Sequence, residues 1–83
     1  MTEDIDLIRV TGVEYIKDYT MDLEFSNGKV KRIDFYPLLK VKMFEPLKDL
    51  SNFVQFGLTH WTIEWFNGAD FAPDYLYRKG VDA

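Results

Sequence analysis

Two Asn-Gly pairs, each preceded by a short alternating segment, constrain the fold of this 83-residue chain more than any other feature. The first pair follows residues 20–25, in which every second side chain is apolar. A period of two is typical of a strand with one buried face, and Asn-Gly fits a tight turn because it tolerates positive φ. We therefore expect a hairpin here, with its return strand over residues 29–35.

Residues 7–15 are rich in β-branched side chains and are expected to form the strand before this hairpin. The phase of their apolar residues changes near Gly12, which indicates a β-bulge or a bend. A polar turn at 17–19 then leads into the next strand. The first half of the chain is therefore predicted to be a three-stranded antiparallel meander.

The middle of the chain carries weaker signals. Pro37 is expected to begin one helical turn, because it lacks the N–H that a first helical residue leaves unbonded. Residues 44–47 are predicted to be an irregular connection. Asp49 is a good N-cap for a short helix over residues 50–56.

A second hairpin is expected from the alternation at 61–65, the second Asn-Gly pair and a short return strand at 69–71. Both tryptophans fall on its buried face, so substitution of either is expected to unfold the chain. Pro73 then begins the last helix, and Gly80 ends it.

The predicted fold class is α+β: a small, mainly antiparallel sheet (three-stranded meander plus second hairpin) with two or three short helices. We expect residues 1–6 to be a flexible acidic N-terminus, residues 7–80 a single domain and residues 81–83 a tail.

Composition excludes several kinds of chemistry. There is no Cys and one His, which excludes disulfides, Cys-based metal sites and two-His sites within one chain. His60 is predicted to be an exposed strand residue. No phosphate-binding glycine loop is present, and we expect no enzyme activity, cofactor or metal.

The longest apolar runs are only a few residues, whereas a membrane helix needs about 20. The acidic N-terminal residues are unlike a signal peptide. We therefore expect a cytoplasmic protein with no membrane partner.

Residues 65–77 resemble the signature of a family of short bacterial proteins, the domain of unknown function 2442. The residues that carry the resemblance are Trp65, Asn67, Gly68, Asp70, Pro73, Asp74, Leu76 and Tyr77. Weaker agreement extends over roughly residues 8–77. The resemblance implies a small α+β fold and a bacterial or phage cytosolic source, but no established activity.

The resemblance also bears on partners. Members of the family are often encoded beside another small uncharacterised protein, an arrangement like that of toxin–antitoxin pairs. Some carry a helix-turn-helix domain, for which this chain, ending at Ala83, has no room. The motif itself is predicted to be structural: Asp70 would satisfy backbone N–H groups before the last helix, and Asp74 would face its N-terminus.

Charge is distributed unevenly along the chain. Residues 29–48 carry a net +4, which leaves −8 on the rest of a chain whose total is −4. The candidate interaction residues in this basic stretch are Lys29, Lys31, Arg32, Lys40 and Lys42. Three interpretations stay open: solvated or edge-protecting charge, a face for a protein partner, or a nucleic-acid contact. The negative total charge disfavours nucleic acid.

Fourteen aromatic rings are more than so small a domain hides easily, which favours a partner surface. We therefore expect a non-enzymatic protein-interaction module, a component of a toxin–antitoxin-like pair. Its partner would be another small protein or a second copy in a homodimer. The alternative is a nucleic-acid-binding accessory or transcriptional regulator that uses the basic 29–48 stretch.

Overall fold

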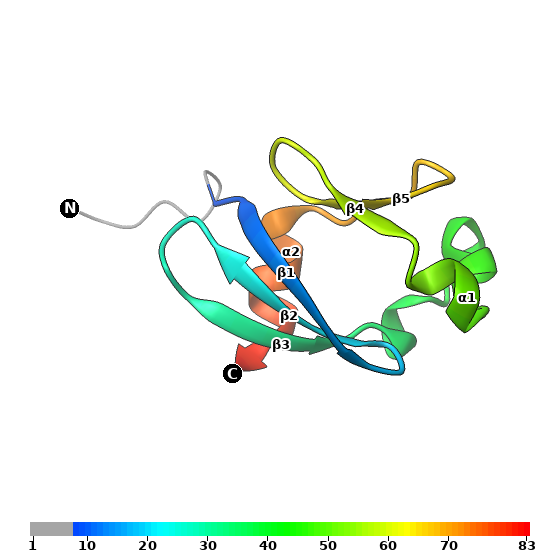
Figure 1. The fold of residues 1–83 in the computed structure, drawn as a ribbon, viewed down its shortest axis with the longest axis horizontal. Coiled ribbons are helices and arrows are strands. Elements are labelled where there is room, and N and C mark those ends of the chain that lie inside the picture. The colour runs from blue at the N-terminus through cyan, green and yellow to red at the C-terminus, as the bar shows by residue number, and fades with distance from the viewer. Residues whose placement is uncertain (1–7) are drawn as a thin grey trace.

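The computed structural model describes residues 8–83, which form an α+β fold (Figure 1). The predicted meander is present as β1 (Val10–Lys17), β2 (Thr20–Phe25) and β3 (Val30–Asp34). A fourth antiparallel strand, β6 (Val81–Asp82), pairs with β3, so the sheet order is β1-β2-β3-β6. The expectation for residues 1–6 lies outside the described residues.

The C-terminal residues 81–83 are part of the sheet, not the tail that the sequence predicts. They reach β3 because the chain passes very close to that strand at Gly80. A Cβ atom on Gly80 would lie 2.8 Å from Lys31 Cβ and 3.0 Å from Ile33 Cγ1. Glycine therefore serves a close approach here as well as ending the helix.

The predicted irregularity at Gly12 is confirmed. The register of β1 against β2 shifts between Val10 and Gly12, and again between Tyr15 and Lys17. A register shift of this kind bends a strand, so β1 is an eight-residue strand with two irregularities.

The two Asn-Gly turns share one geometry. In the second turn the Gly68 N–H donates to the Trp65 carbonyl at 2.9 Å, and the Trp65 N–H donates to the Ala69 carbonyl at 2.9 Å. The first turn repeats these bonds at the equivalent positions. Within these two turns the residues with positive φ are the glycines, at 89° for Gly28 and 82° for Gly68, and not the asparagines.

Two 3₁₀ helices follow the meander, η2 (Tyr36–Leu38) and η3 (Lys42–Lys48). The first contains the helical turn expected at Pro37. The second replaces the irregular connection predicted at 44–47. This segment is helical because Phe44 and Leu47, three residues apart, lie on the same side of a 3₁₀ helix and are both buried in the core.

The central helix α1 (Leu50–Phe53) begins as predicted, because the Asp49 carboxylate accepts the Ser51 N–H at 3.0 Å. It is shorter than the predicted 50–56. The following residues form β4 (Phe56–Leu58) instead, and tertiary pairing overrides the helical pattern.

The second hairpin differs from the prediction. β5 (Ile63–Trp65) pairs with β4, and the expected return strand at 69–71 is reduced to a single bridge between Glu64 and Asp70. Trp61 lies outside the strand with 54% of its surface exposed, so its assignment to the buried face is wrong.

Thr62 is buried in place of Trp61. Its hydroxyl donates to the Phe71 carbonyl at 2.7 Å, which joins the hairpin to the chain that enters the last helix. The Val10 N–H donates to the Trp61 carbonyl at 2.9 Å, so the hairpin is also bonded to β1.

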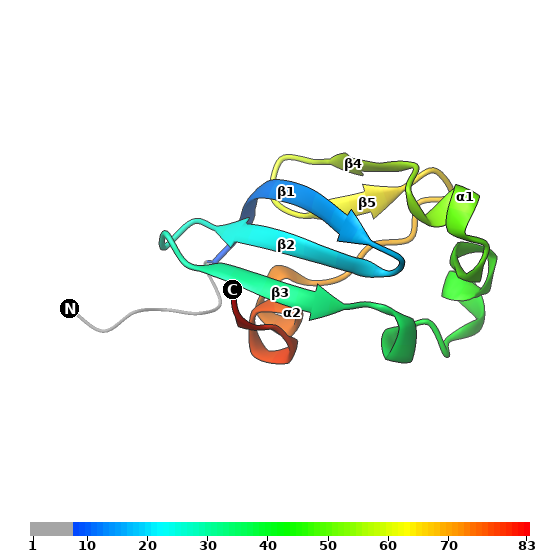
Figure 2. The same cartoon turned by 60° about the horizontal axis from the view of Figure 1, so that its bottom comes forward.

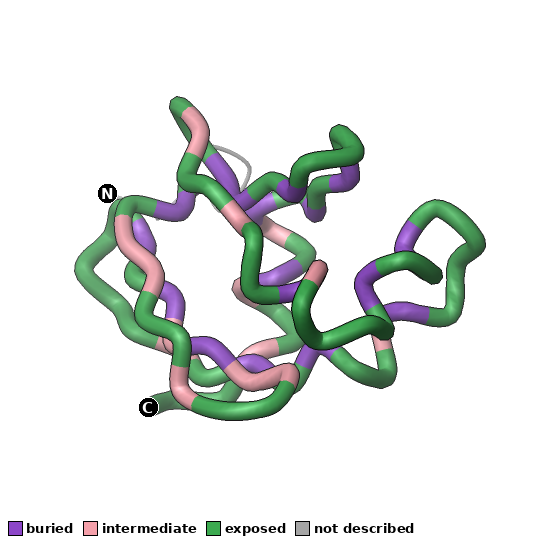
Figure 3. Tube along the Cα trace, turned by 45° about the vertical axis from the view of Figure 1, so that its right-hand side comes forward, coloured by how far each residue is buried: buried purple, intermediate pink, exposed green. Residues whose placement is uncertain are grey.

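The last helix, α2 (Pro73–Lys79), lies behind the four-stranded sheet, whereas α1 and η3 lie beyond one end of it (Figure 2). The core fills the space between these elements (Figure 3), and buried residues alternate with partly buried or exposed ones along β2 and β5. The Phe35 ring lies at its centre, 5.7 Å from Phe53 and Trp65 and 5.6 Å from Phe71 between ring centroids. None of the helices in the described part of the chain is long and apolar enough to span a membrane.

Candidate interaction surface

The five candidate basic residues do not form one patch. Lys31 and Arg32 are consecutive in β3, and consecutive strand residues point to opposite faces of a sheet. Lys31 pairs in register with the buried Leu23 and therefore faces α2, whereas Arg32 pairs with Asp22 on the outer face.

Arg32 forms an ion pair with Asp22. Its Nε lies 2.8 Å from Asp22 Oδ1 and its Nη2 lies 3.0 Å from Asp22 Oδ2, a bidentate arrangement. The hydrogen-bonded guanidinium lowers the pKa of Asp22, and the carboxylate raises the pKa of Arg32 in turn. A guanidinium held in this way is poorly placed to bind an external anion.

Lys31 also contacts other residues of the fold. Its Nζ lies 4.2 Å from the centroid of the Tyr77 ring and 4.0 Å from Asp82 Oδ1. Only 17% of its side chain is exposed. Lys31 therefore helps to hold α2 and β6 against the sheet.

The outer face of the sheet carries more acids than bases. The strand register places six charged residues on it: Glu14, Lys17, Asp22, Glu24, Arg32 and Asp34. Four of these are carboxylates. Such a face repels a phosphate backbone.

Lys40 and Lys42 lie at one end of the molecule. Lys40 belongs to the connection from η2 to η3 and Lys42 is the first residue of η3; the two flank Val41 and are exposed. Neither forms an ion pair with another residue in the range 8–83. Lys29 is exposed as well, but it lies in the first hairpin turn.

Apolar side chains accompany these two lysines. Val41 and Met43 each expose 59% of their surface, and Phe66, in the second hairpin turn, exposes 61%. We call the surface formed by Lys40, Val41, Lys42, Met43 and Phe66 the η3 surface.

A hydrogen bond joins the two parts of this surface. The Asn67 side-chain amide donates to the Met43 carbonyl at 3.2 Å, so the turn that carries Phe66 lies against the start of η3. The next residue, Phe44, stacks on Phe71 with centroids 4.4 Å apart and planes 11° apart. The backbone beneath the η3 surface is therefore anchored in the core.

The motif residues of the C-terminal region pack into the core and against the sheet. Trp65 is buried, and its indole N–H donates to the Phe53 carbonyl at 2.7 Å. Pro73 and Leu76 are buried in α2, and Tyr77 packs edge-on against Phe25 at 5.1 Å. These contacts connect the hairpin, α1, α2 and the sheet.

The two motif aspartates differ in role. Asp74 lies in the first turn of α2, with Oδ2 3.9 Å from Arg78 Nη2. Asp70 does not act as the expected cap, because the N-cap of α2 is Ala72 and no side chain caps it. Asp70 instead takes part in the backbone bridge with Glu64.

His60 is exposed, but it lies in a bend and not in a strand. Among residues 8–83, no three His, Asp or Glu side chains come together in a way that could hold a metal ion.

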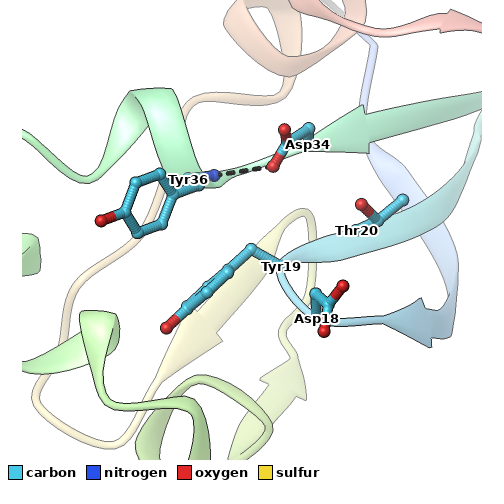
Figure 4. Close-up of a pocket in the computed structure, with 5 residues that line it drawn as sticks. All are labelled: Asp18, Tyr19, Thr20, Asp34 and Tyr36. Carbon is cyan, nitrogen blue, oxygen red and sulfur yellow. Dashed lines mark hydrogen bonds between the residues drawn. The ribbon is translucent and has the colours of Figure 1, made fainter.

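The structure contains a further feature that the sequence does not reveal, an open groove of about 410 Å³ (Figure 4). It is lined by Asp18, Tyr19, Thr20, Asp34 and Tyr36. These residues come from the β1–β2 turn and from the chain that leaves β3. The cross-strand pairing of Thr20 with Asp34 and a hydrogen bond from the Phe35 N–H to the Tyr19 carbonyl at 2.8 Å bring the two segments together.

The chain is similar to known proteins in two respects. A family profile described as "Protein of unknown function (DUF2442)" matches residues 10–82. The crystal structure of a candidate DNA-binding protein from Nitrosomonas europaea ATCC 19718 superposes with a TM-score of 0.76 and 25% sequence identity. The match covers 94% of this chain and 52% of that one, so the chain spans about half the length of its structural neighbour. No curated protein matches this chain significantly.

Proposed function

Since the chain belongs to the DUF2442 family, whose function is unknown, we propose a role from its surface: it is a non-catalytic module that binds an acidic protein through the η3 surface. The observation that carries this proposal is the grouping of exposed apolar side chains with lysines that form no ion pair within residues 8–83. Val41, Met43 and Phe66 are each more than half exposed, and Lys40 and Lys42 flank Val41 in the sequence.

This composition suits a protein partner. Protein interfaces combine an apolar centre with a polar rim, and aromatic side chains and methionine are enriched in them. The anchored backbone beneath the η3 surface limits the entropy lost on binding. The two lysines would select a small acidic protein that carries carboxylates around an apolar patch.

Nucleic-acid binding is the second candidate, because the structural neighbour is described as a candidate DNA-binding protein. Two features of this chain disfavour it. The Arg32 guanidinium is engaged by Asp22, and the outer face of the sheet is predominantly acidic. This chain also spans only about half of that neighbour, so the description could concern the other half.

Site-specific photocrosslinking in cells tests the proposal. A photoreactive amino acid replaces Met43 in one variant and Glu24, on the outer face of the sheet, in a control variant. We expect the variant at position 43 to give a discrete protein adduct that survives nuclease treatment, and the control to give none.

The lysines provide a second control. The adduct from position 43 should be lost when Lys40→Glu and Lys42→Glu are introduced together. An adduct that nuclease removes would favour the nucleic-acid candidate. No adduct from position 43, or equal adducts from both positions, would contradict the proposal.

A further inference from the structure

The groove between the β1–β2 turn and η2 contains none of the residues of the η3 surface and belongs to no site proposed above. We propose that it binds a guanidinium group, the side chain of an arginine on a partner. The inference goes beyond the proposed function and does not depend on it.

Two tyrosine rings form one side of the groove. The centroids of Tyr19 and Tyr36 are 5.0 Å apart and their planes are inclined at 53° (Figure 4). More than half of the Tyr36 surface is exposed, so the ring is accessible from solvent. A cation is attracted to the face of such a ring, and arginine stacks on it more often than lysine does.

Two carboxylates form the other side. Asp18 and Asp34 belong to the groove lining, and neither forms an ion pair with another residue in the described part of the chain. Their negative charge is therefore not neutralised by a close cation from residues 8–83. A guanidinium could stack on a ring while its N–H groups bond to a carboxylate, which an ammonium cannot do in the same plane.

The lining is held in place before any ligand binds. One oxygen of Asp34 accepts the Tyr36 N–H at 3.1 Å, which leaves the other oxygen available. The Tyr19 hydroxyl donates to the Lys48 carbonyl, and its ring packs edge-on against Phe53 at 5.1 Å. Such order lowers the entropic cost of binding.

Asp18 is fixed through its backbone. It adopts a φ of 48°, and its carbonyl accepts the Tyr15 hydroxyl at 2.9 Å. The groove is open and small, so it suits a single side chain better than a large cofactor.

The test is an NMR titration of the full chain with N-acetyl-arginine methylamide. The neutral isostere N-acetyl-citrulline methylamide is the matched probe. We expect saturable shifts of the backbone amides of Asp18, Tyr19, Asp34 and Tyr36 with the arginine probe, and none with the citrulline probe. Equal shifts with both probes would overturn the proposal.

Three variants localise the effect. Asp34→Asn removes the charge but keeps an oxygen for the Tyr36 N–H, and Tyr36→Leu removes the ring but keeps that N–H. Each should weaken binding of the arginine probe by about threefold or more. Glu64→Gln removes one negative charge at the exposed position of β5 and should leave binding unchanged. If all three variants bind the probe like the natural chain, or if Glu64→Gln weakens binding as much as Asp34→Asn, the groove is not the site.

Discussion

The side-chain amide of Asn67 donates to the Met43 carbonyl at 3.2 Å and so fixes the second hairpin turn against η3. The same side chain accepts the Ala69 N–H at 3.1 Å through its oxygen. Asn67 therefore shapes its own turn and also holds the turn that carries Phe66 against the Met43 backbone. A residue expected to act only within a hairpin thus links two parts of the η3 surface.

The two roles of Asn67 can be separated with Asn67→Asp. Aspartate keeps the oxygen that accepts the Ala69 N–H and removes the donor to Met43. The free energy of unfolding should fall by about 1 kcal/mol, measured by urea denaturation, and partner binding should weaken at least severalfold. Asn27→Asp is the matched control: it removes the equivalent amide donor in the first hairpin, where the Tyr77 hydroxyl at 3.0 Å can donate to the new carboxylate instead, and it should leave partner binding intact. Equal partner binding by both variants would show that the turn does not support the η3 surface.

The two tryptophans should respond very differently to substitution. Trp65 is buried and bonded to the Phe53 carbonyl, so Trp65→Ala should destabilise the chain by about 3–5 kcal/mol. Trp61 is mostly exposed, so Trp61→Ala should cost less than about 1 kcal/mol. Thermal denaturation of the two variants provides the measurement. A large loss in Trp61→Ala would mean that its side chain is packed in solution.

Gly80→Ala should destabilise the chain through a steric clash. The new Cβ would lie 2.8 Å from Lys31 Cβ, so α2 and β6 must move away from β3. The expected loss is about 1–3 kcal/mol. Gly57→Ala is the control, because a Cβ there would meet nothing within 4 Å. Similar denaturation midpoints for the two variants would argue against the close approach at Gly80.

The Asp22–Arg32 pair should make stability depend on pH in the acid range. The pKa of Asp22 is lower in the folded chain than in the unfolded one, so the pair stabilises the fold above the ordinary aspartate value of 3.8. This contribution is lost as the pH falls through the lower, folded-state pKa. The stability difference between the natural chain and Asp22→Asn should therefore shrink on acidification.

A double-mutant cycle isolates this pair. In an Arg32→Met background, the same Asp22→Asn substitution should show much less of this pH dependence. A pH dependence that persists unchanged without Arg32 would assign the effect to another contact of Asp22.

Local patterns were sufficient to predict the meander, the bulge near Gly12, the Asp49 cap and the two Asn-Gly turns. Each of these depends on residues close together in sequence. The pairing of β4 with β5, and of β6 with β3, depends on tertiary contacts. Because local patterns do not show such pairing, the sequence predicts a helix over the whole of 50–56 and a tail at 81–83.

The candidate site likewise combines features that depend on local sequence with features that depend on tertiary contacts. The basic residues were grouped because they are close in sequence, although strand alternation already implies that Lys31 and Arg32 face opposite sides. Their partners, Tyr77, Asp82 and Asp22, come from other elements. The contact of Asn67 with Met43 and the groove beside Tyr36 likewise required the tertiary structure.

The affinity of the captured partner for charge-reversed variants tests the central claim most directly. Lys40→Glu with Lys42→Glu reverses the two cations of the η3 surface, and Lys17→Glu with Lys29→Glu makes the same change in net charge elsewhere. Isothermal titration calorimetry with purified, nuclease-treated proteins should show binding weakened at least tenfold in the first variant and little changed in the second. Equal weakening in both variants, or unchanged binding in the first, would contradict the assignment of the η3 surface as the site of interaction.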